Sequence, residues 1–556
     1  MMKDMKELNR ISPHNFRISL FTLLIIGGFS LQAQNFGSVA SRKLQMAEFV
    51  ITNLYVDEVD EDKMVEDVIL KMLSKLDPHS TYSDAEEVKK MNEPLIGNFE
   101  GIGVQFNMIE DTLFIIQPVS NGPSEKVGIL AGDRIIAVDD TTIAGVKMST
   151  EEIMRRLRGP KDSKVKLTIV RREVKDPLFF IVSRDKIPIL SLDASYMIQP
   201  KTGYIRISRF SATTAEEFIE ALKDLQKKGM KDLILDLQGN GGGYLNVAVD
   251  LANEFLNQKT LIVYTEGRSS QRSDFFAKGT GNFRKGRLIV LVDEYSASAS
   301  EIVSGAIQDW DRGVIVGRRT FGKGLVQRPI DLPDGSMIRL TVARYYTPAG
   351  RSIQKPYKTD SPEASSGEED HITRYNHDLI DRYNRGEMIS ADSIHFPDSL
   401  KYQTKKMGRI VYGGGGIMPD YFIPIDTALY TNYHRQLVAK NVILTVTMKY
   451  IEKNRKALLS RYKKFDQFNE RFSVNERILT KMREAADEKG IEFNEEQYNI
   501  SLPLIETQLK ALIARDLWDT NEYFQVINVN NASVKRALEI LDSNEYVQTL
   551  KWKSNQ

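Results

Sequence analysis

The sequence contains no cysteine among its 556 residues. A chain without cysteine forms no disulfide, binds no metal through thiolates, holds no cysteine-ligated iron–sulfur cluster and uses no cysteine nucleophile. Histidine is also scarce, with six residues, and they form neither an H-E-x-x-H motif nor a pair at i and i+4. These absences argue against a zinc hydrolase, and we expect neither a metal nor another cofactor.

Neither sign of charge is in excess, because 76 lysine and arginine residues balance 75 aspartate and glutamate residues, a formal net charge of +1. No chain-wide basic field is present, so we expect no nucleic-acid partner. Hydrophobic residues make up 41% and charged residues 27% of the chain, which is typical of a globular protein rather than a disordered one. The length allows about three to five domains.

Long hydrophobic runs are absent except near the N-terminus. Residues 1–17 carry basic side chains, residues 18–31 are mostly apolar, and Ala33 offers a small residue at a cleavage point. This order predicts a secretory signal peptide over residues 1–33 and an exported, periplasmic protein. The apolar run is shorter than the roughly 20 residues that span a membrane, so an uncleaved membrane anchor is the less favoured alternative.

The remaining chain divides into segments of different pattern. Residues 38–90 have helical periodicity, whereas residues 96–173 alternate in short apolar runs between glycine and proline turns, as in a small β-rich module. Residues 178–350 alternate between strand and helix patterns, which indicates an α/β core with a mostly parallel sheet; we expect this core to extend over 178–425, with a polar insertion over 355–400. Residues 426–556 are charged and helix-periodic, and predict a C-terminal helical region.

One candidate for catalysis stands where a predicted buried strand over 288–292 gives way to a helix. At such a junction Ser298 has free backbone N–H groups and a helix dipole beside it, which can stabilise an oxyanion. The pattern from Ser298 to Glu301 also fits a capping box, which requires no catalysis. This segment alone leaves both interpretations open.

A second candidate is Lys323, which is flanked by glycines. The segment from Gly317 nearly fits the phosphate-binding motif G-x-x-x-x-G-K-[ST], but Gly324 replaces the residue that holds magnesium and no helix is predicted to follow. Nucleotide binding is therefore disfavoured. A desolvated lysine can instead be neutral and act as the base for a serine nucleophile. Gln327, four residues further on, is then a candidate orienting partner.

A glycine-rich segment over 238–243 follows a predicted strand that ends at Leu237. Glycines allow the backbone to approach a ligand and to direct N–H groups at it, so an oxyanion hole is one interpretation. A sharp turn between strand and helix is the other. The segment by itself does not decide between them.

Together these segments resemble the carboxyl-terminal processing peptidases, also called tail-specific proteases. The resemblance extends over residues 44–424 and includes the segments around Ser298 and Lys323. Further matching stretches are residues 76–80, 101–104, 131–135, 203–207, 236–242, 346–354 and 413–420. Each stretch alone is a weak match, but their joint occurrence is highly specific.

The resemblance implies a multidomain α+β protein. Its α/β protease core is ClpP/crotonase-like, with an inserted PDZ domain over 96–173 and helical regions at both ends. Carried over by position, the family's nucleophile falls on Ser298, its general base on Lys323 and the supporting glutamine on Gln327. The separation of Ser298 and Lys323 along the chain agrees with the family, which selects Ser298 over the neighbouring serines.

The same resemblance implies that the backbone N–H groups of Gly242 and Ala299 form the oxyanion hole. The chain departs from the family pattern in this loop, because Gln238 replaces the usual arginine and Gly241 replaces a frequent proline. These departures concern the geometry of the loop rather than the chemistry. No family role is carried over to the final ~130 residues.

The β-rich module resembles a PDZ domain, which binds extended C-terminal peptides. Its glycine-containing turn can offer N–H groups to a terminal carboxylate, and the strand that follows can pair with the peptide. Two apolar residues on the module's helix are expected to line the side-chain pocket, although packing in the core is the alternative for both. The expected peptide-binding residues are Gly101, Ile102, Gly103, Val104, Ile153 and Leu157.

We therefore expect an exported serine endopeptidase that recognises the free C-terminal tails of protein or peptide substrates through its PDZ domain and cleaves them with a Ser–Lys dyad. A catalytically silent PDZ scaffold that only binds peptides is the alternative. An acyl-CoA-type enzyme on a related α/β core is a further one, although no feature of the sequence favours a CoA site. The helices over 426–556 could bind an adaptor or a second copy of the chain.

Overall fold

The computed structural model describes residues 38–172, 174–357 and 371–551. Backbone contacts divide the chain into two units, Met1–Lys75 and Leu76–Gln556. The described part of the first unit holds α2 (Val39–Leu54) and α3 (Glu61–Leu73), which are capped by the side chains of Ser38 and Asp60. The predicted signal peptide lies outside the described residues, and no described helix is long and apolar enough to cross a membrane.

The second unit is built around a six-stranded central sheet. Its strands are, in spatial order, β10 (Leu192–Gln199), β11 (Thr202–Ile207), β12 (Asp232–Asp236), β15 (Leu288–Val292), β16 (Val314–Gly317) and β21 (Tyr421–Phe422). β10 pairs with β11 antiparallel, and all other neighbours are parallel. Three of the four inner strands, β12, β15 and β16, are buried along their whole length, which explains their continuous apolar runs.

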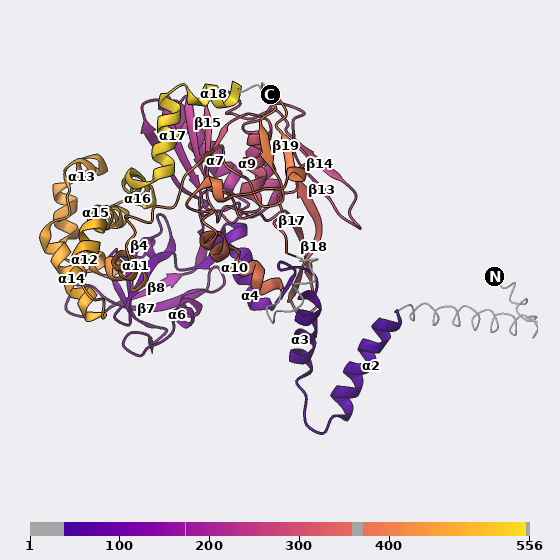
Figure 1. The fold of residues 1–556 in the computed structure, drawn as a ribbon. Helices are drawn as coiled ribbons and strands as arrows, with labels where there is room; N and C mark the ends of the chain where they lie inside the picture. The colour runs from indigo at the N-terminus through magenta and orange to yellow at the C-terminus, as the bar shows by residue number, and fades with distance from the viewer. Residues whose placement is uncertain (1–37, 173, 358–370, 552–556) are drawn as a thin grey trace, which may run out of the picture. The chain divides into compact units, whose positions relative to one another are not determined.

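Helices cover both faces of this sheet. Successive strand residues point to opposite faces, so Leu233 packs with α7 (Thr214–Lys227), α8 (Leu245–Asn253) and α9 (Ala299–Asp309), whereas Ile234 packs on the other face. There the covering residues come from the C-terminal end of the chain, with Val534 and Ile540 of α17 (Ala532–Asp542) among them. Figure 1 shows α17 and α9 on opposite sides of β15.

The predicted C-terminal helical region divides into two parts in the structure. The first part is a bundle with its own hydrophobic core, made of α11 (Asn432–Ala439), α12 (Val442–Arg461), α13 (Phe465–Arg471), α14 (Glu476–Glu488) and α15 (Glu495–Leu517). The second part, α16 (Thr520–Ile527), α17 and α18 (Glu545–Lys551), packs on the central sheet. The last helices of the chain thus belong to the α/β core, which the sequence analysis did not predict.

A second, antiparallel sheet lies beside the core and was not recognised as a sheet from the sequence. Its strands are β1 (Thr81–Ser83), β18 (Met337–Tyr346), β13 (Leu261–Glu266) and β14 (Ser273–Phe276), with β17 (Leu325–Asp331) also paired to β18. The polar insertion over 355–400 contains α10 (His371–Asn384) in its described part, and a small hairpin of β19 (Lys401–Gln403) and β20 (Ile410–Tyr412) follows it.

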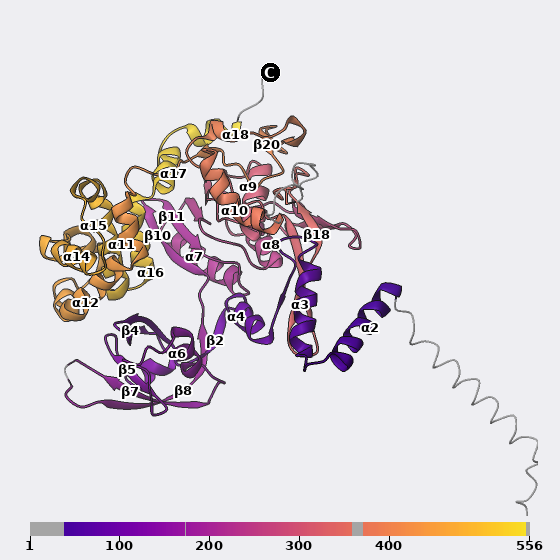
Figure 2. The same ribbon diagram turned by 60° about the horizontal axis from the view of Figure 1, so that its bottom comes forward.

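The β-rich module forms a separate sheet with the strand order β3 (Val104–Ile109), β4 (Thr112–Pro118), β5 (Arg134–Val138), β7 (Lys164–Val170) and β8 (Leu178–Ser183). The short strand β6 (Thr141–Thr142) pairs with β5, and the helices are α5 (Pro123–Lys126) and α6 (Thr150–Leu157). Figure 2 shows α6 against these strands. β8 belongs to this sheet, although we expected the protease core to begin at residue 178.

Two short elements form the ends of the module. β2 (Asn98–Gly101), which leads into it from α4 (Ala85–Ile96), pairs antiparallel with β9 (Asp185–Pro188), which leads out of it. The chain therefore enters and leaves the module through one two-stranded ladder. This ladder places Gly101, the start of the expected peptide-binding turn, at the base of the module.

Candidate active site

Ser298 occupies a sharp turn between β15 and α9. Its backbone has φ 55° and ψ −110°, a conformation that residues with a side chain rarely adopt. Ser296 and Ser300 are fully buried and donate hydrogen bonds to the carbonyl groups of Leu237 and Asn240, at 2.8 and 2.9 Å, whereas Ser298 is only partly buried. Of the three serines in this segment, the turn thus exposes Ser298.

The carboxylate of Glu301 connects the Ser298 turn to the Lys323 loop. Its Oε2 accepts the N–H of Ser298 at 2.8 Å and the N–H of Lys323 at 2.9 Å. Its Oε1 accepts the N–H of Gly322 at 2.8 Å and the hydroxyl of Thr320 at 2.5 Å. Glu301 has no exposed surface, so its capping of α9 and its bond to the Lys323 loop form one buried network. Capping of α9 by Glu301 thus does not argue against a catalytic role for Ser298, because the same carboxylate also holds the Lys323 loop.

Tyr345 makes a second connection between the two candidates. Its hydroxyl lies 3.1 Å from the carbonyl oxygen of Ser298 and also donates to the carbonyl oxygen of Lys323. Tyr345 belongs to β18 and is buried. The backbones of Ser298 and Lys323, 25 positions apart in the sequence, therefore meet at a single phenol group.

The Lys323 side chain is largely buried, and burial lowers the pKa of its ammonium group below the usual value. The positive charge of Arg339 on β18 lowers this pKa further, whereas Glu301 and Asp77 raise it. In the described structure no hydrogen bond joins Lys323 Nζ to Ser298 Oγ; the two residues are connected through their backbone groups, which bond to the side chains of Glu301 and Tyr345. Catalytic hydrogen bonds often form only once substrate is bound.

Gln327 is directed at a segment before β1 that also surrounds the site. Its side-chain amide donates to the carbonyl oxygen of His79. Asp77 orders this segment by accepting the N–H groups of His79 and Ser80 at 2.9 and 3.0 Å. Burial and the nearby charge of Lys323 lower the pKa of His79 to about 4, so its ring is neutral at neutral pH. Gln327 thus holds the wall of the site in this structure.

The glycine-rich loop brings the two expected oxyanion donors next to Ser298. A Cβ atom added to Gly242 would lie 2.9 Å from Ser298 Cβ and 3.0 Å from the backbone nitrogen of Ala299. Ala299 is the first residue of α9, so its N–H has no acceptor within the helix. The N–H of Gly242 donates to Oδ1 of Asn240 at 2.8 Å. The N–H of Ala299 is thus beside Ser298, whereas the N–H of Gly242 is bonded within its own loop.

The expected peptide-binding turn lines a small pocket of about 70 Å³ in the β-rich module. The residues around it are Phe99, Gly101, Ile102, Gly103, Val104, Phe106, Met154, Leu157 and Arg158. Ile153, which we expected in the pocket, is fully buried in the core of the module, so Met154 takes its place on α6. Leu157 lies in both the core and the pocket lining.

Comparison with known protein families assigns four segments of the chain to families. Residues 201–361 match Peptidase family S41 and residues 101–178 match the PDZ domain. Residues 30–87 match the activating protease CtpB N-terminal domain, and residues 433–519, which cover most of the bundle, match a family of unknown function, DUF8443.

A carboxy-terminal-processing protease of Bartonella bacilliformis is 38% identical over 328 residues, which cover 58% of this chain and 73% of the relative. The carboxy-terminal processing protease CtpB of Bacillus subtilis is 36% identical over 58% of this chain and 68% of its own. The chain belongs to the carboxy-terminal processing proteases of the S41 serine peptidase family. A solved photosystem II D1 C-terminal processing protease is 31% identical, covers 55% of this chain and 82% of its own, and has a TM-score of 0.33.

Sequence analysis assigned no role to several residues around the site of this S41 peptidase, although His79 lies in the matching stretch 76–80. Tyr345 and Arg339 come from β18, and His79 from the segment before β1; the pairing of β17 with β18 and of β1 with β18 brings them to Lys323. Within the described ranges, no group of three or more histidine, aspartate or glutamate side chains is arranged to hold a metal ion.

Proposed function

We propose that this carboxy-terminal processing protease cleaves peptide bonds with Ser298 as nucleophile and Lys323 as general base. The observation that carries the proposal is the Glu301 carboxylate, which accepts the backbone N–H groups of both residues from a fully buried position. A carboxylate with a single purpose as a helix cap would need only the first of these bonds. Its second bond fixes the Lys323 loop relative to the nucleophile.

The chemistry follows from the burial of Lys323. Its lowered pKa increases the fraction of neutral amine, which takes the Ser298 hydroxyl proton as Oγ attacks the substrate carbonyl. The resulting ammonium group then gives this proton to the leaving amine as the C–N bond breaks. Water, deprotonated by the same lysine, releases the acyl group and restores Ser298. The role proposed for Gln327 is to hold the His79 carbonyl and so the wall beside Lys323.

The oxyanion is stabilised, in this proposal, by the N–H groups of Ala299 and Gly242. The Ala299 N–H is already directed outward from the start of α9. Rotation of the Asn240 side chain breaks its 2.8 Å bond with Gly242 and frees the second donor. Assembly of the oxyanion hole is thus coupled to a local change of the loop, which a bound substrate can induce.

We propose that the PDZ domain captures the substrate's free C-terminus. β3 lies at the edge of its sheet, so an extended peptide can add a strand there. The turn from Gly101 to Val104 then receives the terminal carboxylate, and Leu157 and Met154 contact the last side chain. Arg158 also lines this pocket; its guanidinium forms an ion pair with Glu93 at 2.5 Å and lies 4.9 Å from the centre of the Phe99 ring.

We also propose that the protein is exported through the N-terminal signal peptide predicted for residues 1–33. N-terminal sequencing of protein purified from the periplasm tests this. A mature chain that begins at residue 34 agrees with the proposal, whereas a chain that retains residue 1 contradicts cleavage and favours the membrane anchor.

Cleavage of a partly unfolded reporter protein with an apolar C-terminus tests the catalytic proposal. The reporter is prepared with a free C-terminal carboxylate and with an amide, and is incubated with the wild-type protein and with Ser298→Ala. We expect wild type to cut the free-ended reporter faster and Ser298→Ala to cut neither. Equal cutting of both forms contradicts recognition of the carboxylate, and cutting by Ser298→Ala contradicts the nucleophile. A peptide-binding scaffold is favoured if the protein binds the reporter but does not cleave it, and if a serine-reactive probe does not label Ser298.

A further inference from the structure

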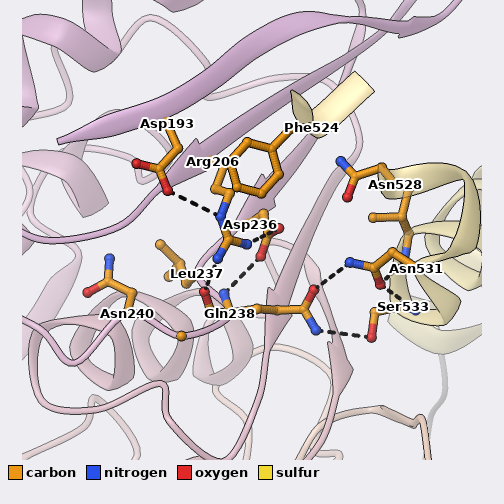
Figure 3. A network of polar contacts seen from close by, with 12 residues as sticks. Asp193, Arg206, Asp236, Leu237, Gln238, Asn240, Phe524, Asn528, Asn531 and Ser533 are labelled. Atoms are coloured by element: carbon orange, nitrogen blue, oxygen red, sulfur yellow. Dashed lines mark hydrogen bonds and ion pairs between the residues drawn. The ribbon is translucent and has the colours of Figure 1, made fainter. Parts of the chain in front are cut away.

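Gln238 lies at the start of the glycine-rich loop, between the central sheet and the C-terminal helices. Its backbone is held by the core: the N–H donates to Oδ1 of Asp236 at 2.8 Å, and the carbonyl oxygen accepts from the Arg206 guanidinium at 2.7 Å. Arg206 in turn forms an ion pair with Asp236 at 2.6 Å and lies 4.8 Å from the centre of the Phe524 ring on α16. Figure 3 shows this network.

The side chain of Gln238 points away from the core and toward the start of α17 (Figure 3). Its Oε1 accepts the side-chain N–H of Asn531 at 3.1 Å, and its Nε2 donates to the Ser533 hydroxyl at 3.3 Å. Asn531 is the N-cap of α17, and its Oδ1 accepts the N–H of Ser533 at 3.0 Å. The amide of Gln238 is therefore joined to the N-cap residue of this helix and to its second residue.

On its other side, the turn over 237–240 is bonded to the nucleophile segment. The N–H of Gly239 donates to Oδ1 of Asp293 at 2.9 Å, and the carbonyl oxygen of Leu237 accepts the Ser296 hydroxyl. The carbonyl oxygen of Asn240 accepts the N–H of Ala297 at 3.0 Å. A shift of this turn would therefore move the residues on either side of Ser298 as well as the Gly242 amide that follows.

The contact with Gln238 is not needed to keep α17 on the sheet. An apolar face of α17, with Val534, Ala537 and Ile540 completely or almost completely buried, already packs on the central strands. Two hydrogen bonds from a partly exposed amide add little to that burial. They fix the position of the turn relative to the helix end, because the turn is rich in glycine and has few side chains of its own to hold it.

We infer that Gln238 is a positioning residue, through which the N-terminus of α17 fixes the turn that places Ser298 and the Gly242 amide for catalysis. The inference rests on the proposed function, since it takes Ser298 and Gly242 as the nucleophile and an oxyanion donor. It assigns a role in the reaction to the last helices of the chain. Loss of the contact should slow the chemical step and leave substrate binding and global stability nearly unchanged.

The test compares four variants of the full-length mature protein. Gln238→Leu keeps the length of the side chain and removes both hydrogen bonds. Gln238→Glu keeps two acceptors for Asn531 and Ser533, and Asn531→Asp keeps the cap of α17 while the Gln238 amide can rotate to donate to it. The double variant Gln238→Glu/Asn531→Asp places two carboxylates at the contact, which repel each other and have no N–H to share.

The readouts are kcat and KM on a peptide substrate, the rate at which a fluorophosphonate labels Ser298, and the melting temperature. Removal of a whole oxyanion donor lowers kcat by about 10²- to 10³-fold, so displacement of one should lower it by about tenfold. We expect this loss in kcat and in labelling for Gln238→Leu and for the double variant, with KM unchanged. Both single conservative variants should stay within about twofold of wild type, because the contact is remade in each.

Asn528→Ala is the matched control. The Asn528 side chain is buried between the same helical segment and the same sheet, where its amide donates to the Tyr196 hydroxyl at 2.9 Å, and it does not touch the turn. This variant should lower the melting temperature and leave kcat unchanged. The inference is wrong if Gln238→Leu keeps the wild-type kcat, or if Asn528→Ala loses as much kcat as Gln238→Leu. It is also wrong if the double variant has the same kcat as the two conservative single variants. Activity in Ser298→Ala would instead refute the proposed function on which it rests.

Discussion

Replacement of Gly242 by alanine tests the geometry of the oxyanion loop directly. The new Cβ would lie 2.9 Å from Ser298 Cβ, 2.9 Å from the carbonyl oxygen of Ala297 and 3.0 Å from the Ala299 nitrogen. Carbon atoms in ordinary contact are about 3.5–4.0 Å apart, so the loop must withdraw from the nucleophile by roughly 0.5 Å. Gly242 also has φ +104°, a conformation that L side chains rarely adopt, and the related left-handed region costs a residue with a Cβ about 1–2 kcal/mol.

This withdrawal should remove one oxyanion donor from the position at which the negative charge develops. We expect kcat to fall by about 100-fold, which corresponds to about 2.7 kcal/mol of transition-state stabilisation, with little change in KM. The assay is the pre-steady-state rate of acylation by an activated ester, with the melting temperature measured on the same samples. Acylation isolates the step in which the tetrahedral intermediate forms.

Gly241→Ala is the control within the same loop. A Cβ at Gly241 meets no atom within 4 Å, and its φ is not positive. This variant should acylate at the wild-type rate and be more stable by about 0.4–1 kcal/mol, because alanine restricts the unfolded chain. If Gly242→Ala acylates normally, or if both variants lose activity equally, the steric contact with Ser298 is not what places the donor.

Three further predictions concern the base and the peptide pocket. Because the positive charge of Arg339 lowers the pKa of Lys323, Arg339→Gln should raise that pKa and move the acid limb of the kcat/KM profile to higher pH. The control Arg344→Gln, at an exposed position on the same strand, should leave the limb where it is. An unchanged limb in Arg339→Gln would argue against Lys323 as the base. Because Glu301 raises the pKa of Lys323, Glu301→Gln should move the acid limb to lower pH. It should also reduce kcat, and lower the stability by about 1–3 kcal/mol for each buried hydrogen bond left unmade. An unchanged pH profile would contradict the effect of the Glu301 charge on Lys323. Met154→Asp should raise KM for a free-ended peptide by about tenfold or more through like-charge repulsion, and an equal rise for the amidated peptide would exclude the carboxylate as the group that is repelled.

Local patterns in the sequence were sufficient for the elements that carry Ser298. The apolar run of β15 and the helical spacing of α9 depend on residues close together in the chain, and the structure has the strand at Leu288–Val292 and the helix at Ala299–Asp309. The surroundings of Lys323 were not predictable in this way, because Arg339 and Tyr345 reach it through strand pairing across the second sheet. Their residue types are common in any exposed strand.

For α6 and α17 the sequence predicts the helix but not which residues its side chains contact. The spacing of apolar residues predicts that α6 is amphipathic, but Ile153 and Met154 lie next to each other in the sequence, and only the angle at which the helix meets the sheet decides that Ile153 enters the core. For α17 the pattern predicts a helix with one apolar face and gives no indication of its partner. That partner is a sheet whose strands lie between residues 192 and 422, far from α17 in the sequence.

The position of α17 has a consequence for the order in which the molecule is completed. During synthesis the strands of the central sheet emerge long before residues 532–542, so one apolar face of that sheet stays uncovered until nearly the whole chain is available. A nascent or truncated chain then contains Ser298 and Lys323 but lacks the helix that covers one face of the central sheet. We therefore expect the active site to reach its final geometry only after α17 has packed on the sheet.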